Sequence, residues 1–239
     1  MAFIDALAFW CRRQTIFWML SLPIAGLAAM VAYLFETRAE IGAWREHWGW
    51  DFLFTLIYAM FLDRWMKETL LDGALPSDEA DEMRRSTVAA RFLTFAIVFC
   101  LMALATVPSP FVELNIVACA GAASLFVLIL PALAAHQPMS LQEAFMLGRP
   151  LRAHLFLLVG GAMVLSLGTG LGLDWLGRVL AHKAWISAAL AAAQRLVDCL
   201  LLAGLGYGLA TVFRTITDWH QPEPADHPFR GVRMRARSA

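Results

Sequence analysis

Charged residues are scarce in this sequence. Asp, Glu, Lys and Arg make up 16% of the 239 residues, whereas a typical soluble domain has roughly 25%. The 19 basic residues are matched by 19 acidic ones, so the chain lacks the excess positive charge that nucleic-acid binding needs. Its four cysteines, at positions 11, 100, 119 and 199, lie far apart and do not form the framework of a disulfide-stabilised secreted module.

Catalytic and metal-binding motifs are also missing from the sequence. It contains no HExxH, CxxC or GxSxG motif, so no catalytic or metal-ligating set can be assembled. Gly168-Thr-Gly170-Leu-Gly172 has the spacing of a nucleotide-binding loop, but it lies in an apolar run with no preceding strand and no P-loop lysine. We therefore expect no enzyme activity, no cofactor and no metal, with a membrane-embedded lipid enzyme as the alternative.

Long apolar runs dominate the chain instead. Apolar residues make up 60% of it, and its mean hydropathy is +0.63. Because a helix needs about 20 apolar residues to cross the bilayer core, we predict an all-α polytopic membrane helix bundle. One integral domain covers residues 1–217, and residues 218–239 form a mobile basic cytoplasmic tail. The six predicted spans cover residues 15–35, 48–65, 92–107, 114–135, 155–173 and 194–214.

Basic residues are divided unevenly between the two sides of these spans. With the N-terminus inside, the inner segments hold fourteen Lys and Arg residues and the outer segments hold four. This asymmetry follows the positive-inside rule, so we expect both termini to be cytoplasmic. Every tryptophan except Trp18 falls near a predicted span end, where indole rings prefer to lie.

Short amphipathic helices are expected on the membrane surface before spans one, three and five. In the clearest one, Ser140 and Glu143 have the spacing of a capping box. Gly148 suits the left-handed position after the helix, and Pro150 prevents its continuation. One interpretation is an internal repeat, in which three units, each a surface helix followed by a helical hairpin, account for the chain. The alternative is that any cytoplasmic loop before a span tends to be amphipathic and basic. The other two segments are Phe3–Trp10 and Ser77–Val88.

Several motifs resemble those of a known group of proteins. They are Asp5-Ala-Leu-Ala-Phe-Trp-Cys-Arg-Arg13, Leu62-Asp-Arg-Trp65, Leu70-Leu-Asp-Gly73, Leu125-Phe-Val-Leu-Ile-Leu-Pro-Ala132 and Ser140-Leu-Gln-Glu-Ala-Phe-Met-Leu-Gly-Arg149. Their order and spacing resemble bacterial six-helix inner-membrane proteins, similar to the membrane domain of some glycerophosphodiester phosphodiesterases and to the uncharacterised YciC-like family. The resemblance implies this fold in the bacterial inner membrane, without hydrolase activity, because we expect no phosphodiesterase catalytic domain in the chain.

Arg195 and Asp198 are the sharpest candidates for a functional site. Ionisable groups inside a bilayer are costly and usually pair or line a cavity, and residues three apart on a helix can face the same way. If the sixth span begins near Trp185, both lie near the bilayer middle; if it ends at Phe213, both lie at the outer interface. We favour the interface, because Arg214 then marks the inner boundary. The pair serves as a helix–helix ion pair or, alternatively, as part of a polar pathway.

A second set of candidates consists of basic residues on the predicted cytoplasmic side. Arg64 and Lys67 end the second span, and Arg149 and Arg152 precede the fifth. Such clusters can bind anionic lipid headgroups. A solvated helix end is the alternative for Arg64 and Lys67, because Asp63 and Lys67 have the spacing of an intrahelical ion pair.

Two pairs of glycines are candidates for close helix packing. Gly168 and Gly172 in the fifth span, and Gly204 and Gly208 in the sixth, have the small-xxx-small spacing that lets helix backbones approach each other. We expect these glycines to pack inside the bundle, with a dimer interface as the alternative.

The features together predict a non-enzymatic integral membrane protein that acts as a structural, assembly or regulatory component. The alternative is a small transporter or lipid-handling protein with a polar pathway near Arg195 and Asp198. We expect membrane lipids as partners, with a membrane-protein partner or a second copy of the chain as further candidates, and no nucleic acid.

Overall fold

The computed structural model describes residues 8–37, 48–71, 112–135, 139–180 and 183–218, with residue 137 and short helical stretches at 92–94, 96–98 and 100–101. These residues are almost entirely helical and include no strand, which confirms the predicted all-α class. The segments Phe3–Leu7 and Ser77–Val88 of the predicted surface helices, part of the third span and residues 219–239 of the tail lie outside the described residues. The helices are α2 (Gln14–Thr37), α3 (Trp48–Leu71), α5 (Val112–Phe126), α6 (Ile129–Ala134), α7 (Leu141–Gly148), η2 (Arg149–Leu151), α8 (Arg152–Val179) and α9 (Ala184–Thr217).

Among the described residues, three helical stretches are long and apolar enough to cross a membrane. They are α2, the stretch Leu141–Val179 that contains α7 and α8, and α9. The chain is thus a membrane protein by helix length and composition, whereas the predicted count of six spans is not confirmed. Helix α3 has 24 residues, but it carries five charged side chains at positions 51, 63, 64, 67 and 68.

The predicted fourth span, residues 114–135, is divided into two helices. A turn at Val127 and Leu128 separates α5 from α6. Pro131 has no N–H group and cannot donate to the Val127 carbonyl four residues earlier. The N–H of Leu130 donates to that carbonyl instead, at 3.1 Å. Helix α5, with 15 residues, is about 22 Å long and does not reach across a core of about 30 Å.

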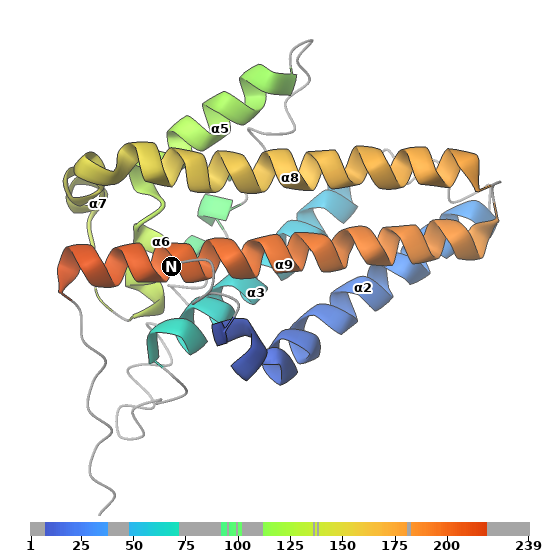
Figure 1. The fold of residues 1–239 in the computed structure, drawn as a ribbon, viewed down its shortest axis with the longest axis horizontal. Helices are drawn as coiled ribbons and strands as arrows, with labels where there is room; N and C mark the ends of the chain where they lie inside the picture. Colours follow the sequence, from blue (N-terminus) through green and yellow to red (C-terminus); the bar gives the residue numbers. More distant parts are fainter. Residues whose placement is uncertain are drawn as a thin grey trace, which may run out of the picture.

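Helix α9 is the central element of the bundle. It lies between α8 on one side and α2 and α3 on the other, and α5 packs against α8 (Figure 1). The sequence of α9 is rich in Ala and Gly, which lets neighbouring helices pack close to its backbone. At Gly206, an added methyl group would lie 3.1 Å from the Leu62 side chain of α3.

Two apolar clusters hold the helices together. One contains buried residues of α3, α6, α8 and α9 towards the C-terminal ends of α3 and α9. The other joins α2, α3 and α9 through aromatic rings, with Phe17 of α2 packed against Phe61 and Trp65 of α3. Trp65 is 1% exposed and donates to the Ala203 carbonyl at 2.9 Å. Its ring thus fills the core between the helices, and its predicted level at a span end stays a prediction.

The turn from α7 into α8 differs from the prediction at its C-terminal end. The capping box is present, since Ser140 and Glu143 each accept a hydrogen bond from the other's backbone N–H. Gly148, however, has a right-handed conformation with φ of −71°, so the predicted left-handed glycine was wrong. The chain continues through η2, where Pro150 lies in the first turn. The missing N–H group of proline costs no hydrogen bond there, because N–H groups at the start of a helix have no partner within the helix. Gly148 is buried beside Leu128 and Leu155. Glycine therefore suits this position because it has no side chain, and not because it can adopt a positive φ.

Candidate functional site

The candidate site is a polar cluster around the carboxylate of Asp198. Asp198 lies in α9, fourteen residues after the helix begins at Ala184, which is about 21 Å along the axis. The predicted sixth span began at residue 194, so α9 extends ten residues further towards its N-terminus than expected. Asp198 is buried, and the residues around it come from α3, α8 and α9.

Both carboxylate oxygens of Asp198 accept hydrogen bonds. Oδ2 accepts from the Tyr58 hydroxyl of α3 at 2.9 Å and from Nη1 of Arg195 at 3.3 Å. Oδ1 accepts from the Ser166 hydroxyl of α8 at 2.6 Å and from Nε2 of Gln194 at 3.0 Å. Four donors from three helices thus surround one carboxylate. This arrangement offsets the cost of placing a charge in an apolar environment.

Arg195 pairs with Asp198, as the spacing predicted, and contacts two aromatic rings as well. Its Nη1 also donates to the Tyr58 hydroxyl at 3.1 Å. Its guanidinium carbon lies 4.4 Å from the centre of the Phe54 ring and 5.8 Å from that of Tyr58. Cation–π contacts of this kind favour the charged group when water is excluded. The Arg195 side chain is 31% exposed, so the pair lies at the edge of the bundle core.

Sequence reasoning missed two of the partners, Tyr58 and Ser166. Each is a polar residue in an apolar run, which is the signal that could have indicated them, because polar side chains in membrane helices often bond between helices. Their pairing with Asp198 depends on the packing of α3 and α8 against α9. Gln194 also donates to the Ser166 carbonyl at 3.3 Å, and its buried Oε1 has no hydrogen-bond donor among the described residues.

The candidate lipid-binding residues of α3 are engaged by acidic neighbours. Lys67 pairs with Asp63 at 3.0 Å, and both side chains are buried. Arg64 pairs with Glu68 at 2.8 Å and remains 46% exposed. The structure thus places Lys67 in a buried intrahelical pair, whereas Arg64 keeps an exposed surface.

The candidate lipid-binding residues before α8 have a different environment. Arg149 is exposed. Arg152 lies over the Phe145 ring of α7, with its guanidinium carbon 4.0 Å from the ring centre, and its Nη2 donates to the Phe145 carbonyl at 3.3 Å. Neither arginine has an ion pair in the described part of the chain.

The four candidate packing glycines are not equivalent. A methyl group added to Gly208 would lie 3.0 Å from the Leu158 side chain of α8. The same group at Gly168, Gly172 or Gly204 would meet no described residue within 4 Å. Among the described residues, three glycines that the spacing did not single out pack closely instead: Gly160, Gly177 and Gly206.

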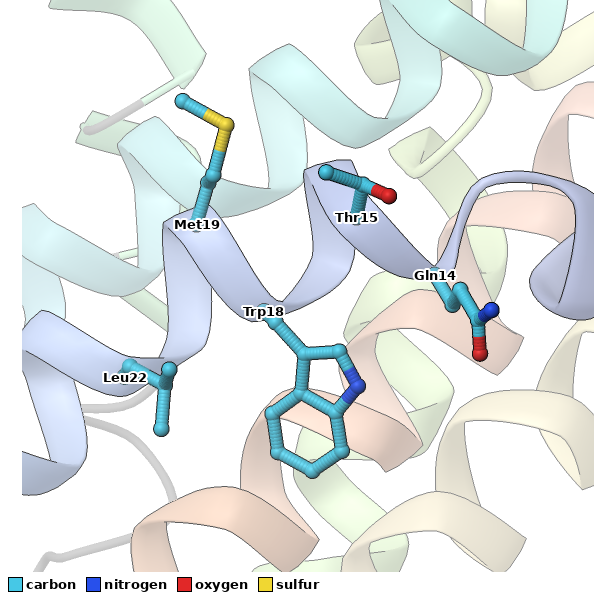
Figure 2. Close-up of a pocket in the computed structure, with 5 residues that line it drawn as sticks. All are labelled: Gln14, Thr15, Trp18, Met19 and Leu22. Atoms are coloured by element: carbon cyan, nitrogen blue, oxygen red, sulfur yellow. The ribbon is translucent and has the colours of Figure 1, made fainter.

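A shallow open depression of about 500 Å³ lies on one face of α2 (Figure 2). None of its lining residues belongs to the polar cluster. Within the described residues, no group of three His, Cys, Asp or Glu side chains could hold a metal ion. The residues that line the depression are Gln14, Thr15, Trp18, Met19 and Leu22.

Comparison with known proteins gives no match: no family model, no curated protein and no solved structure is similar to this chain.

Proposed function

We propose that the chain is a non-enzymatic integral protein of the bacterial inner membrane that acts as a structural, assembly or regulatory component. The observation that carries this proposal is the set of four hydrogen bonds on Asp198, donated from α3, α8 and α9. A carboxylate with four protein donors holds helices together and leaves few sites for a solute. Support for the family and the bacterial membrane comes from the motifs quoted above.

The polar cluster is proposed to lie near the middle of the bilayer rather than at its outer interface. Near one end of the bundle, the Ser187 hydroxyl of α9 donates to the Glu36 carboxylate at the end of α2, at 3.3 Å. Near the other end, the ring of Tyr207 on α9 has its centre 5.3 Å from that of Phe9, and Phe9 is three residues from the basic Arg12. Ser187 and Tyr207 are twenty residues apart, or about 30 Å, which is the thickness of the bilayer core. Asp198 lies between them.

The proposed orientation places both termini in the cytoplasm and the contact between Glu36 and Ser187 outside. Trp175 and Trp185 support this level for the outer interface, because they are 66% and 63% exposed and indole rings prefer the interface. In a cysteine-free background, a membrane-impermeant maleimide should label E36C in intact cells and R149C only after permeabilisation. Labelling with the opposite preference would overturn the orientation.

The experiment that tests the structural role compares folding with function. If Asp198 holds the bundle, Asp198→Asn should lower the folded amount and any cellular phenotype of the protein together. Size-exclusion chromatography of detergent-extracted protein measures the first, and complementation of a deletion strain measures the second. A variant that folds with wild-type stability but fails to complement would contradict the structural role.

A small transporter is the second candidate function, and one observation favours it. Gln194 Oε1 is buried without a donor among the described residues, and the Arg195 guanidinium is partly exposed. A solute could bind these two groups with only a limited rearrangement of the cluster. Solute binding to the purified protein that is lost in Asp198→Asn, with the fold intact, would favour transport over the structural role.

A further inference from the structure

The turn between α7 and α8 combines an exposed apolar surface with two arginines. We propose that this surface, defined by Leu141, Phe145, Met146, Arg149 and Arg152 and called the elbow, binds an anionic phospholipid. The proposal goes beyond the structural role of the chain and requires only that α8 enters the membrane.

Helix α7 presents apolar side chains away from the bundle. Leu141, Phe145 and Met146 are 61%, 40% and 63% exposed, whereas Ala144 and Gly148 on the other face are buried. Phe126 of α5, 36% exposed, extends this surface, with its ring centre 6.5 Å from that of Phe145. Such a helix with one apolar face lies in the interface between headgroups and acyl chains.

Helix α8 is long enough to cross the bilayer core without α7. The 28 residues of α8 are about 42 Å long, already more than the core thickness of about 30 Å. At the junction, Leu151 has φ of −112° and ψ of 11°, so the α-helix is interrupted there. Helix α7 precedes the first turn of α8 (Figure 1), so in the proposed arrangement it lies among the headgroups of one leaflet.

The positive charge of the elbow favours an anionic lipid over a zwitterionic one. Within the described residues, Arg149 and Arg152 lack an acidic partner, and the buried Nε of Arg152 has no acceptor. The acid of this helix, Glu143, accepts from Ser140 at the opposite end of α7. A phosphate group has the acceptor oxygens that two guanidinium groups can share, while acyl chains cover Phe145 and Met146.

The geometry of Arg152 prepares it for this role. Its guanidinium group is held over the Phe145 ring and bonded to the Phe145 carbonyl, so less side-chain freedom is lost when a lipid binds. A guanidinium stacked on a ring can still donate to phosphate through its edge.

Lipid binding to the full-length protein tests the proposal directly. Native mass spectrometry of the detergent-solubilised protein would compare added phosphatidylglycerol with added phosphatidylcholine. We expect tighter binding of phosphatidylglycerol by the wild-type protein, and a loss of about fivefold for each of R149Q and R152Q, as expected for basic groups near an anionic membrane surface. The R149Q variant controls for misfolding, because the side chain of Arg149 makes no hydrogen bond or ion pair with the described residues.

Arg178 offers a matched control at the other end of α8, where it is also exposed. R178Q should bind phosphatidylglycerol as the wild-type protein does. Equal phosphatidylglycerol binding by R149Q/R152Q and wild type would overturn the proposal. A loss of phosphatidylglycerol binding in R178Q equal to that in R149Q would also overturn it. So would phosphatidylcholine binding as tight as that of phosphatidylglycerol, because the elbow would then be a general apolar surface or the docking site of a protein.

Discussion

The hydroxyl group of Tyr58 on α3 lies 2.9 Å from the carboxylate of Asp198 on α9, which is 140 residues away in the sequence. This bond fixes the position of α3 relative to the central helix at a point where Asp198 also bonds to α8. Both residues are buried, so water does not compete for the bond. The three helices therefore share one polar contact.

Tyr58→Phe should destabilise the protein by about 1–2 kcal/mol. The substitution keeps the ring and removes a donor to a charged acceptor, and bonds to charged groups contribute about 1.5–3 kcal/mol in soluble proteins and less in membranes. Unfolding by sodium dodecyl sulfate in mixed micelles measures the change. Tyr33→Phe is the control, because Tyr33 is 48% exposed; equal effects of the two substitutions would contradict the role of Tyr58.

Arg195 and Asp198 should show coupled effects on stability. Asp198→Asn leaves Arg195 without its counter-charge, and Arg195→Gln leaves the carboxylate with three neutral donors, so each should cost about 1–3 kcal/mol. The double variant removes both charges and keeps acceptors for Ser166 and Gln194. It should be less destabilised than the sum of the single variants. Additive effects in the same unfolding assay would show that the two side chains do not interact.

The sequence predicted the helical class and the pair Arg195–Asp198, because both depend on local pattern. Apolar runs indicate membrane helices, and a spacing of three places two side chains on one helix face. The partners Tyr58 and Ser166 could not be assigned, since their meeting depends on how α3 and α8 pack against α9. Helix α9 also extends beyond the predicted sixth span, because the chain stays helical back to Ala184 although Gln194 and its charged neighbours suggested that the span ends there.

Trp65 provides a test of the aromatic cluster between α2, α3 and α9. Its ring is parallel to that of Phe61, with centres 6.2 Å apart, and its indole N–H bonds to Ala203. Trp65→Ala should destabilise the protein by about 3–5 kcal/mol, because it leaves a large cavity and removes the hydrogen bond to the Ala203 carbonyl. Chemical unfolding followed by circular dichroism measures this. Trp18→Ala, at a position 40% exposed, should cost much less, and a similar cost would contradict the burial of Trp65.

Gly208 and Gly172 should respond in opposite directions to the same substitution. At Gly208 an added methyl group would lie 3.0 Å and 3.2 Å from the two terminal carbons of Leu158. Gly208→Ala therefore requires Leu158 to shift by a few tenths of an ångström, and we expect the overpacking to cost about 1 kcal/mol or more. Gly172 has open space around the added carbon, so Gly172→Ala gains up to about 1 kcal/mol of helix propensity. Thermal unfolding in detergent would measure both changes. If Gly172→Ala destabilises the protein as much as Gly208→Ala, this face of α8 packs against a second copy or another partner. That result would favour the dimer interface over packing inside the bundle.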